Sequence, residues 1–409
     1  MKKNNVPLLR FDGFSGDWER VKLSDNANFA KGNGYSKADL VDLGTPIILY
    51  GRLYTNYQTA INEIDTFADI RKNAVLSKGG EVIVPASGET AEDIARASVV
   101  VDSGVILGGD LNIVTADKAI APEFLALSLS NGTPHKELSK RAQGKSVVHI
   151  RNSDLREVIL HLPELDEQSA IAELFQNIDD TIDLKRQEHE KTLNIKKAML
   201  DKMFPKGGAD APEIRFTGFT KPWVRRKLDE ICDLYSGLTY SPADVTESDG
   251  TFVLRSSNVK GGEIVDADNV YVNSTAVNCI NVAVGDVIVV VRNGSRNLIG
   301  KHGQIKRPMP NTVIGAFMSG LRPIQPEFTN ALLDTSHFDF EIAQNLGATI
   351  NQITNGMFKQ MVFSVPTDDD EQSKIGNFFC NLDTLLKAQH EELEKLQSIK
   401  KACLSKMFV

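Results

Sequence analysis

The stretch PLLRFDGFSGDWERVKLSDNANFAKGNGYSKAD at residues 7–39 returns as PEIRFTGFTKPWVRRKLDEICDLYSGLTYSPAD at residues 212–244, without a gap. Both tryptophans of the protein, Trp18 and Trp223, occupy the same position of this repeat. The residues that are identical in the second copy, 205 positions later, include Pro7, Arg10, Phe11, Gly13, Phe14, Trp18, Arg20, Lys22, Leu23, Tyr35, Ser36, Ala38 and Asp39. The sequence therefore predicts an internal duplication, which makes the protein two copies of one structural unit.

The second half of each copy is predicted to be helical. EQSAIAELFQNIDDTI at 167–182 aligns with EQSKIGNFFCNLDTLL at 371–386, and EKTLNIKKAMLDKMF at 190–204 aligns with EKLQSIKKACLSKMF at 394–408. Spacings of four and three alternate, as in the a and d positions of a coiled coil, along Ile375, Phe379, Leu382, Leu386, Gln389, Leu393 and Leu396. The first copy begins the same rhythm at Ile171, Phe175, Ile178 and Ile182, and Lys185 and His189 then interrupt it. Roughly 35 residues at about 1.5 Å each favour a coiled coil over a surface helix packed on a globular core, which remains the alternative.

These blocks set the predicted boundaries. Pro163 and Pro366 each close an apolar alternating run, which is typical of a last strand before a helix. PKGGADAP at 205–212 is typical of a linker. We predict a first domain over 1–163, a spacer helix over 164–205, a linker over 206–211, a second domain over 212–366 and a second spacer helix over 367–409. The fold class is α+β: two mixed α/β domains joined by two long antiparallel coiled-coil helices, with a pseudo-two-fold repeat.

Composition narrows the class of protein. The chain has 409 residues and no apolar run long enough for a membrane span, and its N-terminus lacks the pattern of a secretory signal. Its four cysteines have no paired spacing, which argues against a disulfide framework and favours a cytoplasmic location. The net charge is −8, but residues 164–205 carry ten acids and six bases, and 367–409 carry eight and six. The acidity therefore gathers on the predicted helices, so it does not exclude nucleic-acid binding by the domains.

Two basic stretches are candidates for contact with nucleic acid. Between Val287 and Pro326 no acid occurs, and six cations are interleaved with amide and hydroxyl side chains. HKELSKRAQGKSVVHIR at 135–151 carries five Lys and Arg residues against one Glu. Cations can bind phosphates, and Arg, Asn and Gln can read base edges, whereas the alternative for either stretch is a solvated loop. The candidates chosen from these stretches are Lys136, Lys140, Arg141, Lys145, Arg292, Asn293, Ser295, Arg296 and Lys301.

YGRLYTNYQ at 50–58 adds a third candidate, because Arg52 stands among tyrosines. Arg52, Tyr54 and Tyr57 could contact sugar and phosphate, or they could pack within a hairpin. Apart from their repeated ends, the two domains (40–141 and 245–344) show no obvious similarity in sequence. Shared parts that meet a shared partner twice, and divergent parts that meet different targets, would account for this pattern.

The motifs of an enzyme are missing. An amino-methyltransferase would show Asp/Asn-Pro-Pro-Phe/Tyr, and the sequence contains no Pro-Pro pair. Gly144-Lys145-Ser146 is similar to the end of a phosphate-binding loop, but the first glycine of that motif is replaced by Ser139. The histidines and cysteines have no metal-ligand spacing. We therefore predict no catalytic residue and no metal site in this chain.

The order RF-x-GF-x(3)-W, about 140 variable residues, and an EQ-x(2)-I helix ending in IKKA-x-L-x-KMF, all occurring twice, resembles the specificity subunits of Type I restriction–modification enzymes. The resemblance covers essentially the whole chain. It implies that each variable domain is a target-recognition domain that reads one half of a bipartite site in double-stranded DNA, and that the helices act as a spacer.

The resemblance also implies partners and cofactors. Two methyltransferase subunits would dock on the pseudo-symmetric protein, and restriction subunits would join them. No cofactor is expected in this subunit, since S-adenosylmethionine, ATP and Mg²⁺ would belong to those partners. Two other readings stay open: a scaffold that binds proteins or peptides through two domains on a coiled coil, and a nuclease or methyltransferase in one chain. The missing motifs make the enzyme the weaker of these.

Overall fold

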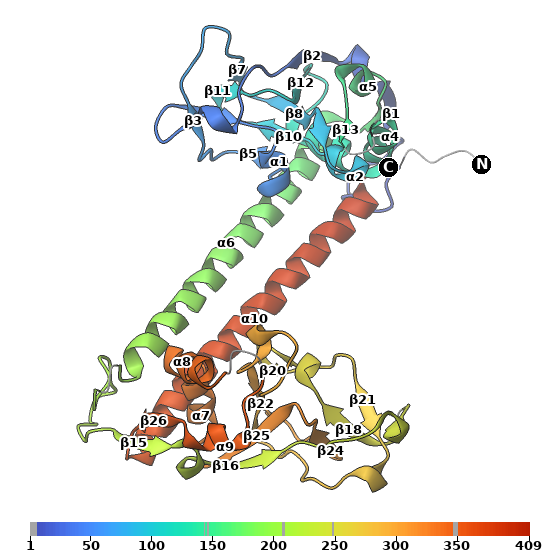
Figure 1. Cartoon of the computed structure of the whole chain (residues 1–409). Coiled ribbons are helices and arrows are strands. Elements are labelled where there is room, and N and C mark those ends of the chain that lie inside the picture. The colour runs from blue at the N-terminus through green and yellow to red at the C-terminus, as the bar shows by residue number, and fades with distance from the viewer. Residues whose placement is uncertain (1–5, 143, 145–146, 207–208, 248, 347–350) are drawn as a thin grey trace. The chain divides into compact units, whose positions relative to one another are not determined.

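The computed structural model describes residues 6–142, 144, 147–206, 209–247, 249–346 and 351–409, which form two compact units (Figure 1). Unit 1 extends to Arg186 and also contains Glu391–Val409, whereas unit 2 comprises Gln187–His390. Each unit consists of one mixed α/β domain, the first part of the long helix that follows it, and the last part of the other long helix. Both units are therefore built to the same plan.

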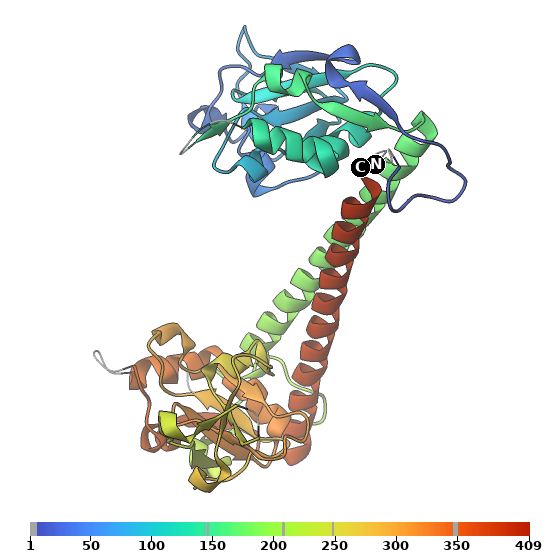
Figure 2. The same cartoon turned by 90° about the vertical axis from the view of Figure 1, so that its right-hand side faces the viewer.

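The two long helices are α6 (Leu165–Met203) and α10 (Asp369–Met407). In unit 1 the rings of Phe175 and Phe408 are 6.0 Å apart, and Lys185 pairs with Glu392 at 3.2 Å. Higher numbers on α6 thus meet lower numbers on α10, so the segments are antiparallel and lie side by side in both views (Figures 1 and 2). In unit 2 the last part of α6 meets the first part of α10 in the same sense, through Thr192 with Gln389 and Phe204 with Phe379. The predicted antiparallel helix pairing is confirmed.

The domain of unit 1 contains two five-stranded sheets. The first has the order β2 (Ala27–Lys31), β12 (Leu111–Ala116), β8 (Glu81–Pro85), β10 (Ser98–Val100) and β5 (Ala60–Ile61). The second has the order β3 (Leu40–Val41), β6 (Phe67–Ala68), β4 (Thr45–Ile48), β11 (Ser103–Leu107) and β7 (Leu76–Lys78). Two strand pairs complete it, β1 (Glu19–Lys22) with β14 (Ile159–Leu162) and β9 (Ser87–Gly88) with β13 (Val148–His149). The α-helices are α1 (Arg52–Thr55), α2 (Ala91–Ile94), α3 (Pro122–Ser130), α4 (Gly132–Arg141) and α5 (Asn152–Arg156), and 3₁₀ turns span Leu23–Asp25 and Lys37–Asp39.

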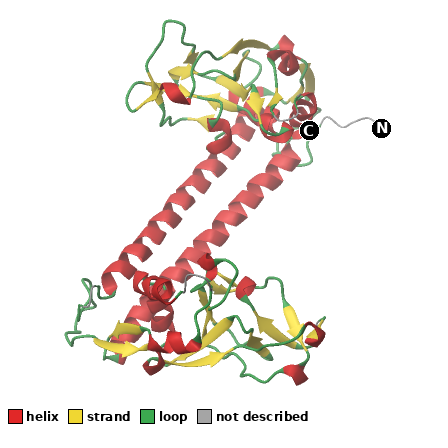
Figure 3. Ribbon diagram, in the orientation of Figure 1, coloured by secondary structure: helices red, strands yellow, loops and turns green. Residues whose placement is uncertain are grey.

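The domain of unit 2 repeats this mixed architecture (Figure 3). Its six-stranded sheet has the order β16 (Cys232–Ser236), β25 (Met318–Pro323), β22 (Val287–Val290), β23 (His302–Gln304), β20 (Gly262–Ile264) and β19 (Val259–Lys260). Its four-stranded sheet has the order β17 (Val245–Thr246), β21 (Val270–Val272), β18 (Thr251–Leu254) and β24 (Thr312–Ile314), and β15 (Val224–Lys227) pairs with β26 (Val362–Val365). The α-helices are α7 (Pro326–Leu333), α8 (Ser336–Asn345) and α9 (Asn355–Gln360). The 3₁₀ turns span Leu228–Glu230, Pro242–Asp244, Ser256–Asn258, Ser274–Ala276 and Arg296–Leu298.

The two domains share an arrangement of central strands that is not visible in their sequences. In both, a strand (β12 or β25) pairs antiparallel with an early strand of the domain (β2 or β16). On its other side it borders a central strand, β8 or β22, which lies between two antiparallel neighbours, β12 and β10 or β25 and β23. The turn into this strand contains Gly80 in one copy and Gly285 in the other, with φ of 87° and 94°. Only glycine adopts this left-handed conformation without strain. The variable segments are therefore two divergent versions of one fold.

The repeated motifs join each domain to its helix. Arg10 Nε and Nη2 donate to the two carboxylate oxygens of Glu167, both at 2.7 Å, and Arg215 binds Glu371 in the same way at 2.6 and 2.7 Å. Both glutamate side chains are only 1% exposed. Bidentate pairs of this kind are strong and directional, so the RF and EQ motifs hold each helix at a defined position on its domain.

The repeated aromatic residues bring the other helix to the same place. The Phe408 ring, near the end of α10, lies 5.8 Å from Phe124 in unit 1. The Phe204 ring, near the end of α6, lies 5.9 Å from Phe328 and 6.0 Å from Trp223 in unit 2. The KMF end of each long helix is thus part of the core of the unit in which it ends.

Candidate nucleic-acid interface

The candidates of unit 2 gather at one end of the six-stranded sheet. Arg292, Asn293, Ser295 and Arg296 follow β22 directly, and Lys301 is held nearby because Val290 N donates to its carbonyl at 2.8 Å. Arg292, Ser295, Arg296 and Lys301 are exposed. The structure therefore brings five residues chosen from the sequence onto one surface.

Local hydrogen bonds fix the shape of this surface. Asn293 Nδ2 donates to Ser256 Oγ at 3.1 Å, and its Oδ1 accepts from the Ser295 backbone at 2.9 Å. The Arg292 guanidinium lies 4.9 Å from the centre of the Phe317 ring, and Phe317 is 50% exposed. An arginine held over an aromatic face in this way loses less conformational freedom on binding and keeps its donors accessible.

Several amide and hydroxyl groups beside this cluster were not among the candidates predicted from the sequence. Asn351 Nδ2 donates to the Gly294 carbonyl at 3.1 Å, and Gln352 forms a backbone bridge with Arg292. Asn355 Nδ2 donates to Ser236 Oγ at 2.8 Å, and Ser319 Oγ donates to Asn355 Oδ1 at 2.9 Å. The Asn- and Gln-rich run QNLGATINQITN at 344–355 was the available signal. Its pairing with Arg292 is a long-range contact that no local pattern predicts.

Two other cations of the acid-free stretch have structural partners. Arg322 binds both oxygens of Asp286 at 2.8 Å, and the Asp286 side chain is 1% exposed. Lys306 lies 3.8 Å from Glu263. Arg322 therefore compensates a buried carboxylate, and its charge belongs to the stability of the domain.

In unit 1, Lys136 and Lys140 are exposed on α4, and Arg141 is half-buried at its last residue. Within the part of the chain that the structure describes, no ion pair engages Lys136 or Lys140. Lys145 lies outside the described residues. The lysines of α4 are thus available to a polyanion, as the local charge excess predicts.

The three candidates of the 50–58 stretch are engaged inside the domain. The Arg52 side chain is 10% exposed and donates to Asp65 at 3.0 Å and to the Glu63 carbonyl at 2.7 Å. Tyr54 and Tyr57 donate to the carbonyls of Ser87 and Ala97 at 2.8 and 3.2 Å, and burial raises the pKa of both phenols. The segment is the short helix α1 with its flanking turns rather than a hairpin. These contacts agree with the alternative in which the three residues pack within their own domain. The candidate interface therefore does not include them.

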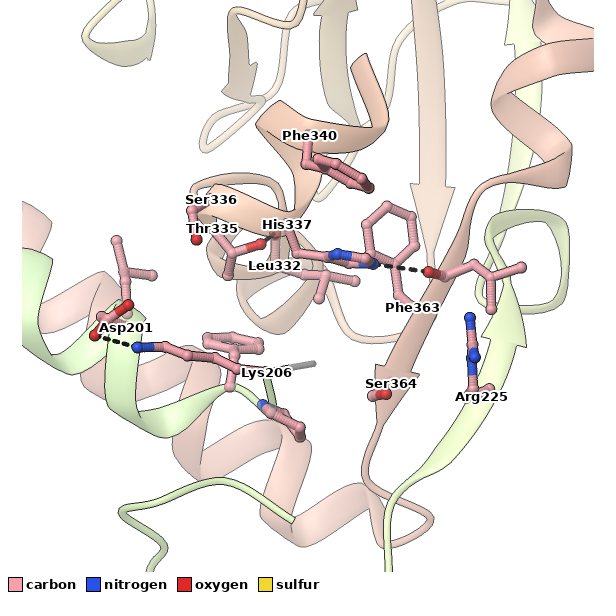
Figure 4. A pocket seen from close by; sticks show the side chains of 14 residues that line it. Asp201, Lys206, Arg225, Leu332, Thr335, Ser336, His337, Phe340, Phe363 and Ser364 are labelled. Atoms are coloured by element: carbon pink, nitrogen blue, oxygen red, sulfur yellow. Dashed lines mark hydrogen bonds and ion pairs between the residues drawn. The ribbon is translucent and has the colours of Figure 1, made fainter. Parts of the chain in front are cut away.

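A cavity of about 310 Å³ in unit 2 lies between the end of α6, α8 and the β15–β26 pair (Figure 4). At this cavity His337 Nε2 lies 3.0 Å from the backbone carbonyl oxygen of Val362, and the side chains of Lys206 and Asp201 form an ion pair. Among the described residues, no group of three or more His, Cys, Asp or Glu side chains is placed to hold a metal ion. None of the described helices is long and apolar enough to cross a membrane.

Comparison with known proteins identifies the same family in both halves of the chain. A family model, the Type I restriction modification DNA specificity domain, matches residues 15–194 and again 220–398. The Type I restriction enzyme MjaVIII specificity subunit of Methanocaldococcus jannaschii is 22% identical over 400 residues, which cover 95% of this chain and 91% of that protein.

Two solved structures have the same fold. The S subunit of a Type I restriction-modification system from M. genitalium superposes with a TM-score of 0.67 at 15% identity, over 99% of each chain. A chain from a structure of complex assembly and conformational transition in the type I R-M system gives 0.54 at 18% identity, over 95% of this chain and 96% of that one. The two matches of the family model account for the duplication seen in the sequence and in the structure. The chain therefore belongs to the Type I restriction–modification DNA specificity family, whose members recognise a DNA sequence and are not themselves catalytic.

Proposed function

We propose that this chain directs a Type I restriction–modification complex to a split, asymmetric site in double-stranded DNA, with each domain reading one half. The observation that carries the proposal is the pair of divergent domains on one repeated framework. Two identical domains related by a pseudo-two-fold axis would read a palindrome, as symmetric dimeric DNA-binding proteins do. Because these two domains present different side chains, the two halves of the site differ.

The long helices set the distance between the two half-sites. Within each unit, α6 and α10 are paired antiparallel through buried side chains such as Phe175 and Phe379. Paired helices resist compression and bending better than a flexible linker does, so their length acts as a ruler. The length of the DNA spacer then follows from the number of helical residues rather than from the recognition domains.

Lengthening both helices by one heptad tests the ruler. Inserting seven residues after position 187 of α6 and seven after the facing position 390 of α10 preserves the a/d register and adds about 10 Å to each helix. At about 3.4 Å per base pair this predicts a spacer about three base pairs longer, with unchanged half-sites. Sequencing of the methylated sites shows the spacer directly. An unchanged spacer in a folded, active variant would contradict the ruler role.

The repeated helix segment IKKA is the site where two methyltransferase subunits dock. Lys196 turns inward to Asp383, at 2.6 Å, and its counterpart Lys400 pairs with Asp179. The side chains beside them face outward in both copies, and Ile195 and Ile399 are 42% and 44% exposed. A repeated apolar residue on an exposed helix face, flanked by polar groups, is typical of a surface that meets the same partner twice.

Introduction of a negative charge at the docking surface tests this assignment. Ile195→Glu and Ile399→Glu, each exposed and therefore tolerated by the fold, are expected to reduce the number of bound methyltransferase subunits from two to one, and the double variant to none. Co-purification with the methyltransferase subunit and mass determination of the complex measure this number. Thr181→Glu, another exposed position of α6, serves as the control. Full assembly of the double variant would exclude the IKKA surface as the docking site.

Restriction subunits join the same assembly, and the chemistry is performed by the partners in the cytoplasm. S-adenosylmethionine serves the methyltransferase subunits, and ATP and Mg²⁺ serve the restriction subunits. The net charge of −8 supports the assignment of most of the DNA affinity to the partner subunits, because a protein that binds DNA strongly by itself is usually basic. Tight binding then needs the methyltransferase subunits, which add positive surface around the DNA. Strong, salt-dependent binding by the isolated chain would refute this.

A further inference from the structure

The ends of the two equivalent central strands, β8 and β22, can be aligned residue by residue. Ala86 N donates to the Asp110 carbonyl at 2.7 Å, and Val291 N donates to the Phe317 carbonyl at 3.0 Å. These bonds make Ala86 equivalent to Val291, and Asp110 equivalent to Phe317. The alignment depends only on backbone hydrogen bonds, so it does not require any similarity in sequence.

The segment that pairs beyond these strands is also shared. Ile150 N donates to the Ala86 carbonyl at 3.2 Å, and Ile353 N donates to the Val291 carbonyl at 2.9 Å. One residue further along, Ser87 pairs with His149 in unit 1, and Arg292 pairs with Gln352 in unit 2. We call each of these two-stranded pairings, with the residue that supports it (Asp110 or Phe317), the edge ribbon of its domain.

An asparagine follows the ribbon in both copies. Asn152 Nδ2 donates to the Ala30 carbonyl of β2 at 2.9 Å, and its counterpart Asn355 donates to Ser236 Oγ of β16 at 2.8 Å. Each asparagine begins a short helix, α5 or α9, that follows the ribbon. In both copies the chain that leaves the ribbon is therefore bonded to the equivalent strand of the sheet.

The side chains that the ribbons present are different. Unit 2 presents the exposed Arg292 over Phe317, together with the partly exposed Gln352. Unit 1 presents the exposed His149, whose Nδ1 lies 3.1 Å from Ser87 Oγ, and the exposed Asp110. All of these except Phe317 carry hydrogen-bonding groups, so that one rigid frame displays two different patterns of donors and acceptors.

We infer that the edge ribbons are the base-reading elements of the two domains, an inference that rests on the proposed function. A rigid two-stranded ribbon can enter the major groove, and a positioned side chain on it can read a base edge. Arg292 suits the two acceptors of guanine, and Gln352 suits adenine. Asp110 suits the amino group of cytosine, and the Ser87–His149 pair supplies further donors and acceptors. The exposed lysines, such as Lys140 and Lys301, contact phosphates and carry no base information.

In unit 1 the residues assigned to base reading differ from the candidates chosen for their charge. His149 lies near the end of the basic stretch 135–151, whereas Ser87 and Asp110 come from two other segments of the chain. Their backbone equivalence with Arg292, Phe317 and Gln352 identifies them.

The test is a methylation-site survey in the host, with the full-length chain and its methyltransferase subunit. Ser87→Ala/His149→Ala is expected to relax at least one base of the first half-site only, and Arg292→Ala at least one base of the second only. The discrimination between the preferred and the next base is expected to fall about 5- to 100-fold at that position. Arg292→Gln is expected to shift a guanine preference toward adenine.

Matched controls separate reading from structure and from phosphate binding. Lys140→Ala and Lys301→Ala are expected to lower methylation evenly at all sites, with the motif unchanged. Unchanged thermal unfolding confirms that the exposed substitutions leave the fold intact. Folded ribbon variants that keep the wild-type motif at full discrimination would overturn the inference while leaving the proposed function standing. A wild-type chain that directs no methylation would instead overturn the proposed function and the inference with it.

Discussion

Replacing Arg215 by methionine removes one half of the buried ion pair that holds α10 on the domain of unit 2. Arg215 binds both oxygens of Glu371 at 2.6 and 2.7 Å, and the glutamate is 1% exposed, with Trp223 Nε1 3.3 Å from Oε1. The substitution leaves a buried carboxylate with one neutral donor. The expected loss in the free energy of unfolding is about 3–5 kcal/mol.

The loss converts to a shift in melting temperature. Unit 2 spans Gln187–His390, or roughly 200 residues, for which the entropy of unfolding is about 0.4 kcal/mol/K. A loss of about 3–5 kcal/mol therefore lowers the melting temperature of this unit by about 7–12 °C. The double variant Arg215→Met/Glu371→Gln no longer buries an unpaired charge, so it is expected to recover much of the loss.

Tryptophan fluorescence can follow unit 2 separately, because each unit contains one tryptophan. A Trp18→Phe background leaves Trp223 as the reporter during urea unfolding and thermal melting. The exposed Arg226→Met serves as the control and is expected to stay within about 0.5 kcal/mol of the parent. A loss below about 1 kcal/mol for Arg215→Met, or a double variant as unstable as the single one, would show that the ion pair does not hold α10 on this domain.

Other predictions concern the same framework. Phe408→Ala removes the ring that lies 5.8 Å from Phe124, so we expect a loss of about 3–5 kcal/mol in unit 1, measured by Trp18 fluorescence; a loss under 1 kcal/mol would show that the end of α10 is not part of that core. Burial raises the pKa of Asp334, but His302 and Lys196 outweigh it and hold this pKa at about 2. Since that value lies below the unfolded one of about 3.9, the stabilisation is complete above about pH 4 and is lost between about pH 4 and 2. Asp334→Asn should therefore differ from the parent at pH 7 and approach it at pH 2.5; an equal difference at both would contradict this.

Much of the framework could be predicted from the sequence because it repeats. Arg10 and Glu167 recur with their counterparts at nearly constant offsets because they form the ion pair between domain and helix. Trp18 recurs as Trp223, and both are buried in the cores of their domains. The a/d spacing predicted the two long helices because period and length together distinguish a coiled coil from other helices.

The shared fold of the two variable domains could not be predicted. Their equivalence lies in backbone pairing, such as β8 with β12 and β22 with β25, and different apolar side chains can fill the same buried positions. The sequence could predict the candidate site only where its residues are contiguous, as in Arg292–Arg296. Gln352 pairs with Arg292 although strands β23–β25 and helices α7 and α8 lie between them in the chain, so no local pattern predicts that pairing.

Arg52 shows the opposite problem. In the sequence, an arginine among tyrosines suggests a residue that contacts phosphate. In the structure the same residue ties its own loop together through Asp65 and the Glu63 carbonyl. Composition alone does not distinguish a cation that binds a partner from one that compensates an internal acid. Burial and the positions of nearby acceptors decide between them.

The proposed function requires that this chain selects a split DNA sequence for methylation. Long-read sequencing of host DNA with and without the gene tests it most directly, since methylated bases are read at every site of the genome. We expect that one asymmetric motif, interrupted by a fixed spacer, loses methylation when the gene is removed. Identical methylation patterns with and without the gene, in a host that expresses the chain together with its methyltransferase subunit, would contradict it.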